Sequence, residues 1–196
     1  VLDRKNMSAP FLPFARADIG DAEIAAVTEA LRSGWVTTGP KARAFEQAFT
    51  DYLGGEGLQS IAVNSATAGL HLALEALGIG PGDEVIAPTL TFTATVEVVR
   101  YLGADPVLVD VDPVTLNIDP EKIRAAITPR TKAIIPVDIG GVPARVKEIM
   151  KVAEDTCAWF SPAVNLRVGG TNPQMRLGRA LVLSDAAHSF GARIDG

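Results

Sequence analysis

Two turns carry the residues most suited to chemistry, and each follows a short apolar run. The run at 61–64 ends in Ser-Ala-Thr-Ala-Gly and opens a helical pattern, so its free backbone N–H groups would point at an anion. The same turn is also a good helix cap, in which Ser65 or Thr67 bonds the orphan N–H groups. The run at 180–184 delivers Asp185 to the end of a predicted strand, where ligands of open α/β sheets gather. An acidic residue there also often caps the next helix.

Together the two turns fit a pyridoxal phosphate (PLP) cofactor. This cofactor needs a phosphate cup, a carboxylate paired with the ring nitrogen, and an apolar face against the ring. Phe92, in the helix start after the strand at 85–87, offers that face, although core filler explains it equally well. The combination with Asp185 therefore favours PLP over simple capping.

The elements that must position these residues alternate between strand and helix, which is typical of an α/β fold. The loop at 35–39 carries an aromatic residue between two of the predicted helices. The pattern predicts helices at 21–31, from Pro40 toward Gly54, and from about Thr91, Pro120 and Pro143; it predicts buried strands at 61–64, 84–87, 106–109, 133–137 and 180–184.

The stretch from Asp155 to Arg179 interrupts this rhythm, because a strand should follow a helix within about 2 to 6 residues. One interpretation is a surface insertion packed by its aromatics, Trp159 and Phe160. The alternative is that its arginines reach a substrate phosphate or a second subunit; these are Arg167, Arg176 and Arg179.

Composition limits the class of protein. The chain has 196 residues, 47% of them hydrophobic, and a net charge of -5, so a sizeable core is expected and nucleic acid is a poor partner. Its single Cys157 excludes an internal disulfide and fits a cytoplasmic protein. No apolar stretch approaches the roughly 20 residues that span a bilayer, so no membrane association is expected.

Two other kinds of site are not favoured. His71 and His188 have no metal-ligand spacing, and the acidic residues between 110 and 121 lack a closing ligand set, so no metal is expected. The glycine-rich run at 78–82 precedes a strand instead of following one, which identifies a helix stop and not a dinucleotide fingerprint.

From about Pro13 to Gly196 the chain resembles the DegT/DnrJ/EryC1/StrS family of PLP-dependent, fold-type I sugar aminotransferases. The motifs that carry the resemblance are Ser33–Pro40 (SGWVTTGP), Asn64–His71 (NSATAGLH), Gly80–Pro88 (GPGDEVIAP), Thr91–Thr95 (TFTAT), Ile118–Pro120 (IDP) and Asp185–His188 (DAAH). In this order and at these separations they are highly specific.

The resemblance implies a role for each cofactor-binding residue. Ala66 and Thr67 would bind the phosphate, and Phe92 would stack on the ring. Asp185 would pair with the ring nitrogen, and His188 would lie near the phenolic oxygen.

The loop that carries Trp35 and Thr37 would lie by the substrate entrance in such an enzyme. The family implies transfer of an amino group, with glutamate the expected donor, to a nucleotide-linked keto-sugar in polysaccharide, lipopolysaccharide or secondary-metabolite biosynthesis. A homodimer is also implied, with active sites near the subunit interface.

The implied fold is the fold-type I large domain, an α/β fold with a mainly parallel sheet in three α/β/α layers, incomplete at the carboxyl end. Residues 1–17 would form an extended segment, and 18–196 part of the PLP-binding domain with 155–179 inserted; the small carboxyl-terminal domain would be absent. The strand at 61–64 would lack its sheet neighbours. We therefore expect the amino-terminal part of a larger enzyme.

Catalytic activity is not expected of these residues alone. The family's Schiff-base lysine follows the Asp185 turn by a few elements, which places it beyond Gly196, and no lysine of the chain is expected to face Asp185. Ser184 stands where the family usually has Glu, a minor departure. Two alternatives remain: a non-catalytic binding or assembly module, and a sugar dehydratase of the same family with histidine in place of the lysine.

Overall fold

The computed structural model describes residue 13 and residues 16–163 and 171–194 of the chain. Contacts between residues divide the chain into two units, unit 1 (Val1–Ala62) and unit 2 (Val63–Gly196).

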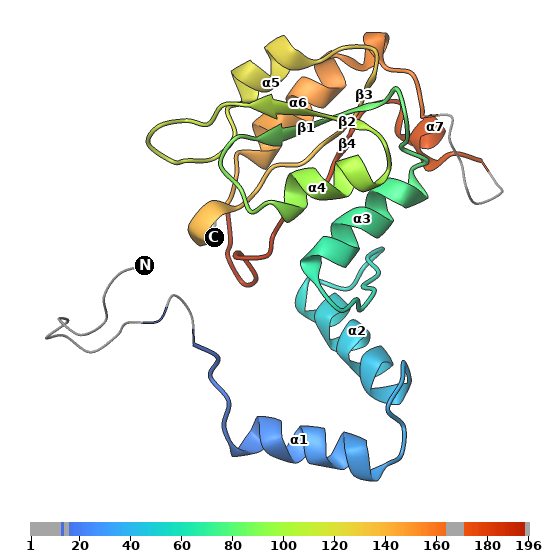
Figure 1. Ribbon diagram of the computed structural model, residues 1–196, viewed down its shortest axis with the longest axis vertical. Helices are drawn as coiled ribbons and strands as arrows, with labels where there is room; N and C mark the ends of the chain where they lie inside the picture. The colour runs from blue at the N-terminus through green and yellow to red at the C-terminus, as the bar shows by residue number, and fades with distance from the viewer. Residues whose placement is uncertain (1–12, 14–15, 164–170, 195–196) are drawn as a thin grey trace, which may run out of the picture. The chain divides into compact units, whose positions relative to one another are not determined.

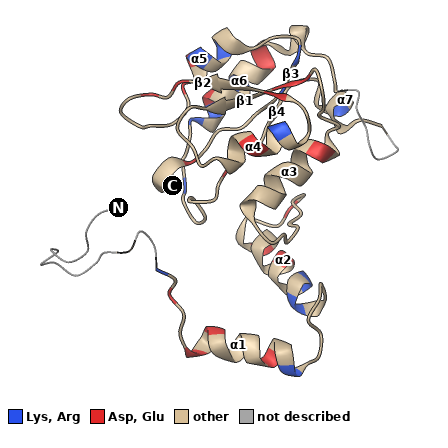
Figure 2. Ribbon diagram, viewed as in Figure 1, with Lys and Arg blue, Asp and Glu red and all other residues tan. Residues whose placement is uncertain are grey.

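The described part of unit 1 contains two helices, α1 (Asp21–Arg32) and α2 (Pro40–Tyr52), which confirms the two predicted from the sequence (Figure 1). The N–H of Gly20 donates to Glu23 Oε2 at 2.7 Å and so closes the first turn of α1. Acidic side chains lie in that first turn and Arg32 in the last, the arrangement that the helix dipole favours (Figure 2).

Unit 2 contains a four-stranded sheet with helices around it. Its strands are β1 (Glu84–Pro88), β2 (Asp105–Val109), β3 (Thr131–Ile134) and β4 (Leu181–Val182). Its helices are α3 (Ala66–Ala76), α4 (Ala94–Tyr101), α5 (Pro120–Ala126), α6 (Val146–Asp155) and α7 (Pro173–Leu177), with short 3-10 turns at Ile139–Gly141 and Cys157–Trp159. The strands are all parallel in the order β2-β1-β3-β4, so their carboxyl ends share one edge of the sheet.

The two faces of this sheet carry separate apolar clusters. Val85 of β1 belongs to the cluster formed with α3 and α4, whereas the next residue, Ile86, belongs to the cluster formed with α5 and α6. This alternation follows from the period of two along a strand. Figure 1 shows the helices on both sides of the sheet, so the predicted three-layer α/β/α arrangement is confirmed.

The predicted strand at 61–64 is wrong: these residues form no strand. No strand of the described residues pairs with them, and Ile61 is 80% exposed. The N–H of Ala62 instead donates to Glu46 Oε1 at 2.8 Å. An apolar run without a neighbouring strand has no ladder to join, which is why the pattern alone misled.

Other predicted bounds shift by a few residues. β3 ends at Ile134 instead of 137, and α4 and α6 begin three residues later than expected. Beyond the regular β4, the N–H of Leu183 donates to Ile134 O at 2.9 Å, so strand-like pairing continues toward Asp185.

Within the predicted insertion at 155–179, the described residues are held by side-chain amides as well as by an aromatic residue. Phe160 packs against the apolar cluster, but Trp159 is exposed. Buried Asn172 caps α7, and its Nδ2 donates to the carbonyls of Leu77 and Ala163.

The arginines of the insertion remain unassigned. Arg167 lies outside the described residues, Arg176 is exposed, and Arg179 donates to Ala180 O. Their proposed reach to a phosphate or second subunit therefore stays a prediction.

Candidate functional site

Asp185 lies at the carboxyl edge of the sheet, just beyond β4. Its N–H donates to Pro136 O at 2.8 Å, and its carbonyl accepts from Asp138 N at 3.1 Å. These bonds extend the parallel pairing of β3 with β4 and fix the backbone of Asp185. The residue is only 8% exposed, so its carboxylate lies in a poorly solvated position where charge interactions are strong.

One threonine contacts this carboxylate, and a second threonine contacts the first. The hydroxyl of Thr95, in the first turn of α4, donates to Asp185 Oδ2 at 2.8 Å. Thr91 Oγ1 lies 2.7 Å from Thr95 Oγ1. Sequence reasoning missed this role, although both threonines belong to the TFTAT motif; a bond between residues 90 positions apart leaves no local pattern.

A second buried carboxylate holds the turn that follows Asp185. Asp138 Oδ2 accepts from the Ser189 hydroxyl at 2.6 Å, and Oδ1 accepts from Ala144 N at 2.8 Å. Gly141 has φ +84°, and a Cβ there would lie 3.1 Å from His188 O, so this close approach requires glycine. The turn thereby presents His188 as an exposed side chain near Asp185.

The start of α3 combines a cap with open backbone donors. Ser65 Oγ accepts from Ala68 N at 3.1 Å, so the capping interpretation of this turn is confirmed. The N–H groups of Ala66 and Thr67 have no hydrogen-bond partner among the described residues. Capping and anion binding are therefore compatible here, because the cap uses a different N–H.

Phe92 lies in the turn between β1 and α4 and is 75% exposed. The core-filler explanation is therefore wrong. Its carbonyl accepts from Thr95 N at 3.2 Å, so the backbone of the phenylalanine is tied to the same helix start that contacts Asp185.

Trp35 and Thr37 lie in the loop between α1 and α2 of unit 1. Trp35 is exposed, and its Nε1 donates to Thr38 O at 3.1 Å. The ring packs against Gly39, where a Cβ would lie 2.0 Å from Nε1. The substrate role of this loop stays a prediction.

Lys132 is a candidate for an unusual amine, because it is buried at the start of β3. Its Nζ donates to Pro129 O at 2.8 Å, and burial lowers the pKa of its ammonium below the ordinary 10.5, against the opposing effect of Asp83. It belongs to the amino end of a parallel sheet, whereas Asp185 follows the carboxyl ends. Lys132 therefore cannot serve Asp185.

Asp110 and Asp119, which follow β2, both accept hydrogen bonds from nearby residues. The N–H of Val111, and then Lys122, lower the pKa of the Asp110 carboxyl. Asp119 caps α5 by accepting from Glu121 N at 2.9 Å. Within the described ranges, no group of three or more His, Cys, Asp or Glu residues could hold a metal ion.

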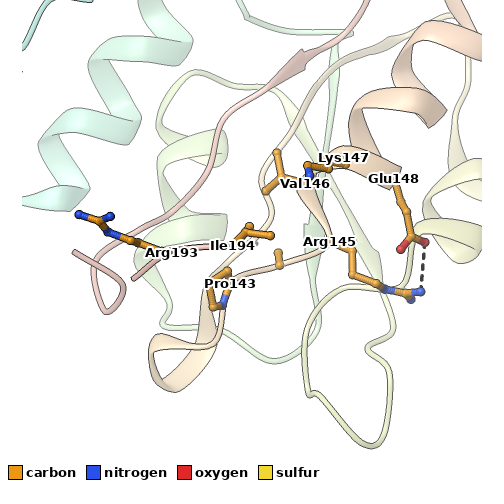
Figure 3. Close-up of a pocket in the computed structure, with 8 residues that line it drawn as sticks. Pro143, Arg145, Val146, Lys147, Glu148, Arg193 and Ile194 are labelled. Carbon is orange, nitrogen blue, oxygen red and sulfur yellow. Dashed lines mark hydrogen bonds and ion pairs between the residues drawn. The ribbon is translucent and has the colours of Figure 1, made fainter. Parts of the chain in front are cut away.

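A cavity of about 390 Å³ lies at the start of α6 and is not lined by Asp185 (Figure 3). Arg145 is directed toward Glu148, with Nη1 3.1 Å from Oε2, whereas Arg193 points away from the other side chains. These cations do not converge on one point, so the cavity is a poor anion site.

The described helices include none that is long and apolar enough to cross a membrane.

A model of the DegT/DnrJ/EryC1/StrS aminotransferase family matches residues 17–160, which is most of the chain. The chain belongs to this family. The family depends on PLP, as the sequence motifs indicate. The family assignment and the fold made from the sequence are thus both confirmed.

Solved structures agree with this assignment. Spr1654 from Streptococcus pneumoniae, assigned as a sugar aminotransferase, is 38% identical with a TM-score of 0.84 in its apo-form, over 92% of this chain and 43% of its own. Its PLP-form and PMP-form have also been solved, and match with TM-scores of 0.84 and 0.83.

Two further solved structures also match the chain. 3-Amino-5-hydroxybenzoic acid synthase is 36% identical, with a TM-score of 0.73, over 93% of this chain and 42% of its own. DesV from S. venezuelae is 34% identical, with a TM-score of 0.69, over 86% of this chain and 39% of its own. The chain thus spans less than half the length of each of these solved structures.

Proposed function

We propose that this chain supplies the cofactor pocket of a PLP-dependent aminotransferase that moves an amino group from glutamate to a nucleotide-linked keto-sugar. Asp185 carries the proposal: it is a carboxylate at the carboxyl edge of a parallel sheet, nearly buried, and held on one oxygen by Thr95. Open α/β sheets bind ligands at this edge.

The residues around Asp185 fit PLP. The unpartnered N–H groups of Ala66 and Thr67 suit the dianionic phosphate, which the positive end of the helix dipole also favours. Exposed Phe92 offers a ring face for stacking, and exposed His188 a donor for the phenolic oxygen. When bound, PLP supplies an electron sink and carries the amino group between the two substrates.

Asp185 would hold a proton on the ring nitrogen through a charge-assisted bond. Its low exposure matters, because the same ion pair is screened in water and strong in a low-dielectric site. The second turn carboxylate, Asp138, would keep His188 in place through Ser189.

The family assignment and the exposed loop of unit 1 support a proposal for the substrate and the partners. We propose that Trp35 and Thr37 contact the sugar nucleotide, and that the enzyme acts as a homodimer. A lysine that removes and returns the substrate proton is required. We assign no described lysine to that step, because the buried one, Lys132, lies at the opposite edge of the sheet.

The test uses Asp185→Asn in the native protein that carries this chain, with Asp155→Asn as a matched surface control. Asp155 pairs with Arg124 at 2.9 Å and is exposed, whereas Asp185 is buried. Removing a charge at a preorganised site costs on the order of a hundredfold in rate or more.

The expected result is a loss of glutamate-driven amination of keto-sugar nucleotides in Asp185→Asn, with phosphate-dependent cofactor binding largely kept and the control unchanged. Normal amination by Asp185→Asn would contradict the assignment. A panel of sugar nucleotides with different bases and keto positions would identify the substrate.

A further inference from the structure

The hydroxyl of Thr95 is buried and has one covalent proton to donate. It gives that proton to Asp185 Oδ2 at 2.8 Å, and Thr95 has no solvent exposure. Charge-assisted O–H···O⁻ bonds are among the stronger hydrogen bonds in proteins. The bond therefore fixes the rotation of the Asp185 side chain before any ligand arrives.

The direction of the neighbouring bond follows from counting protons. Thr91 Oγ1 and Thr95 Oγ1 lie 2.7 Å apart, and either atom could donate. Because the Thr95 proton is used on ionised Asp185, Thr91 must be the donor to Thr95. The order Thr91 to Thr95 to Asp185 couples the turn that carries Phe92 to the carboxylate.

The other carboxylate oxygen stays available. Asp185 Oδ1 accepts from Ala187 N at 3.3 Å, a long bond that leaves at least one lone pair of this oxygen unused. A ring N–H approaching Asp185 would thus meet Oδ1 in a fixed orientation, while Thr95 occupies Oδ2.

We propose that Thr95 is a positioning residue, which orients Asp185 for the ring nitrogen of the cofactor and ties this orientation to the Phe92 turn. The inference rests on the proposed function, since it needs a cofactor whose ring nitrogen meets Asp185. It goes beyond the family assignment because it gives a role to a hydroxyl that touches no ligand.

The test compares three variants of the native protein that carries this chain. Thr95→Val removes the hydroxyl at nearly constant shape, and Thr95→Ser restores it. Thr93→Val is the matched control, because Thr93 precedes α4, is exposed and makes no capping bond with its side chain.

Three measurements separate positioning from mere support of the fold. The first is the dissociation constant of pyridoxamine phosphate, by fluorescence titration. The second is the ¹⁵N NMR shift of the ring nitrogen in bound, labelled pyridoxamine phosphate as a function of pH. The third is kcat and KM for glutamate.

For Thr95→Val we expect a ring nitrogen that loses its proton at lower pH than in the parent protein. We also expect kcat to be at least about tenfold lower with KM changed less than about twofold, since a hydrogen bond to a charged group is worth about a factor of ten or more. Thr95→Ser should recover both values, and Thr93→Val should match the parent protein.

The outcomes distinguish a failure of the Thr95 role from a failure of the proposed function. If Thr95→Val binds the cofactor with unchanged ring protonation and kcat, the positioning role is wrong while the proposed function stands. If Thr95→Val and Thr95→Ser are equally impaired, the hydroxyl is not the cause and the role is again wrong. If the folded parent protein binds no pyridoxamine phosphate, the proposed function itself fails.

Discussion

Substitution of Gln174 should strongly lower the free energy of unfolding, although this residue contacts none of the candidate site residues. Its side chain has 0% exposure; its Oε1 accepts from Ala163 N at 2.9 Å and its Nε2 donates to Lys132 O at 2.8 Å. The pairing of β1 with β3 shifts here, so Lys132 has no partner residue in β1. The glutamine thus satisfies the bulge carbonyl of Lys132 and links α7 and Ala163 to β3.

The magnitude follows from the groups that a substitution leaves behind. Gln174→Met keeps the approximate shape but leaves one buried N–H and one buried carbonyl unpaired, at about 1 to 3 kcal/mol each. The expected loss is about 2 to 6 kcal/mol of unfolding free energy, which lowers a urea midpoint by about 1 to 3 M at a slope of about 2 kcal/mol per M.

The assay is urea unfolding followed by Trp159 fluorescence in a Trp35→Phe background, because Trp159 lies four residues before Ala163, which Gln174 holds. Met175→Gln is the matched control: it makes the opposite exchange at the next, exposed residue of α7, where changes stay within about 0.5 kcal/mol. A midpoint for Gln174→Met no lower than that of Met175→Gln would refute the reasoning.

Two further predictions concern a loop and a buried amine. Gly39→Ala should displace the Trp35 ring, because a Cβ at residue 39 would lie 2.0 Å from Trp35 Nε1; a shifted emission in a Trp159→Phe background checks this, and unchanged emission would contradict it. The pKa of Lys132 is lower in the folded state than its ordinary value of 10.5. At pH values between the two, the unfolded state therefore binds more protons than the folded state. The unfolding free energy should therefore rise with pH in that window, and Lys132→Met should flatten the slope in urea melts; an equal slope in both proteins would oppose it.

Much of the α/β order was predictable because it depends on local patterns. Apolar runs predicted the regions of β1 to β4, and Pro40 and Asp119-Pro120 marked helix starts that the structure confirms. The strand predicted at 61–64 was wrong, because a strand needs a neighbouring strand to pair with as well as an apolar pattern.

The site was predictable as a set of motifs but not as a network. Asp185 and the turn at Ser65 follow from strand ends and helix caps, which are local features. The bonds Thr95–Asp185 and Asp138–Ser189 join residues 90 and 51 positions apart, and no short-range spacing encodes them. Buried Gln174 was missed for the same reason, since its partners lie elsewhere in the chain.

The most direct test of the central claim is a crystal structure of the native protein that carries this chain, grown with pyridoxamine phosphate. The account predicts the phosphate on the N–H groups of Ala66 and Thr67, the ring against Phe92, and the ring nitrogen within hydrogen-bond distance of Asp185 Oδ1. A phosphate bound elsewhere, or a ring nitrogen without contact to Asp185, would contradict it.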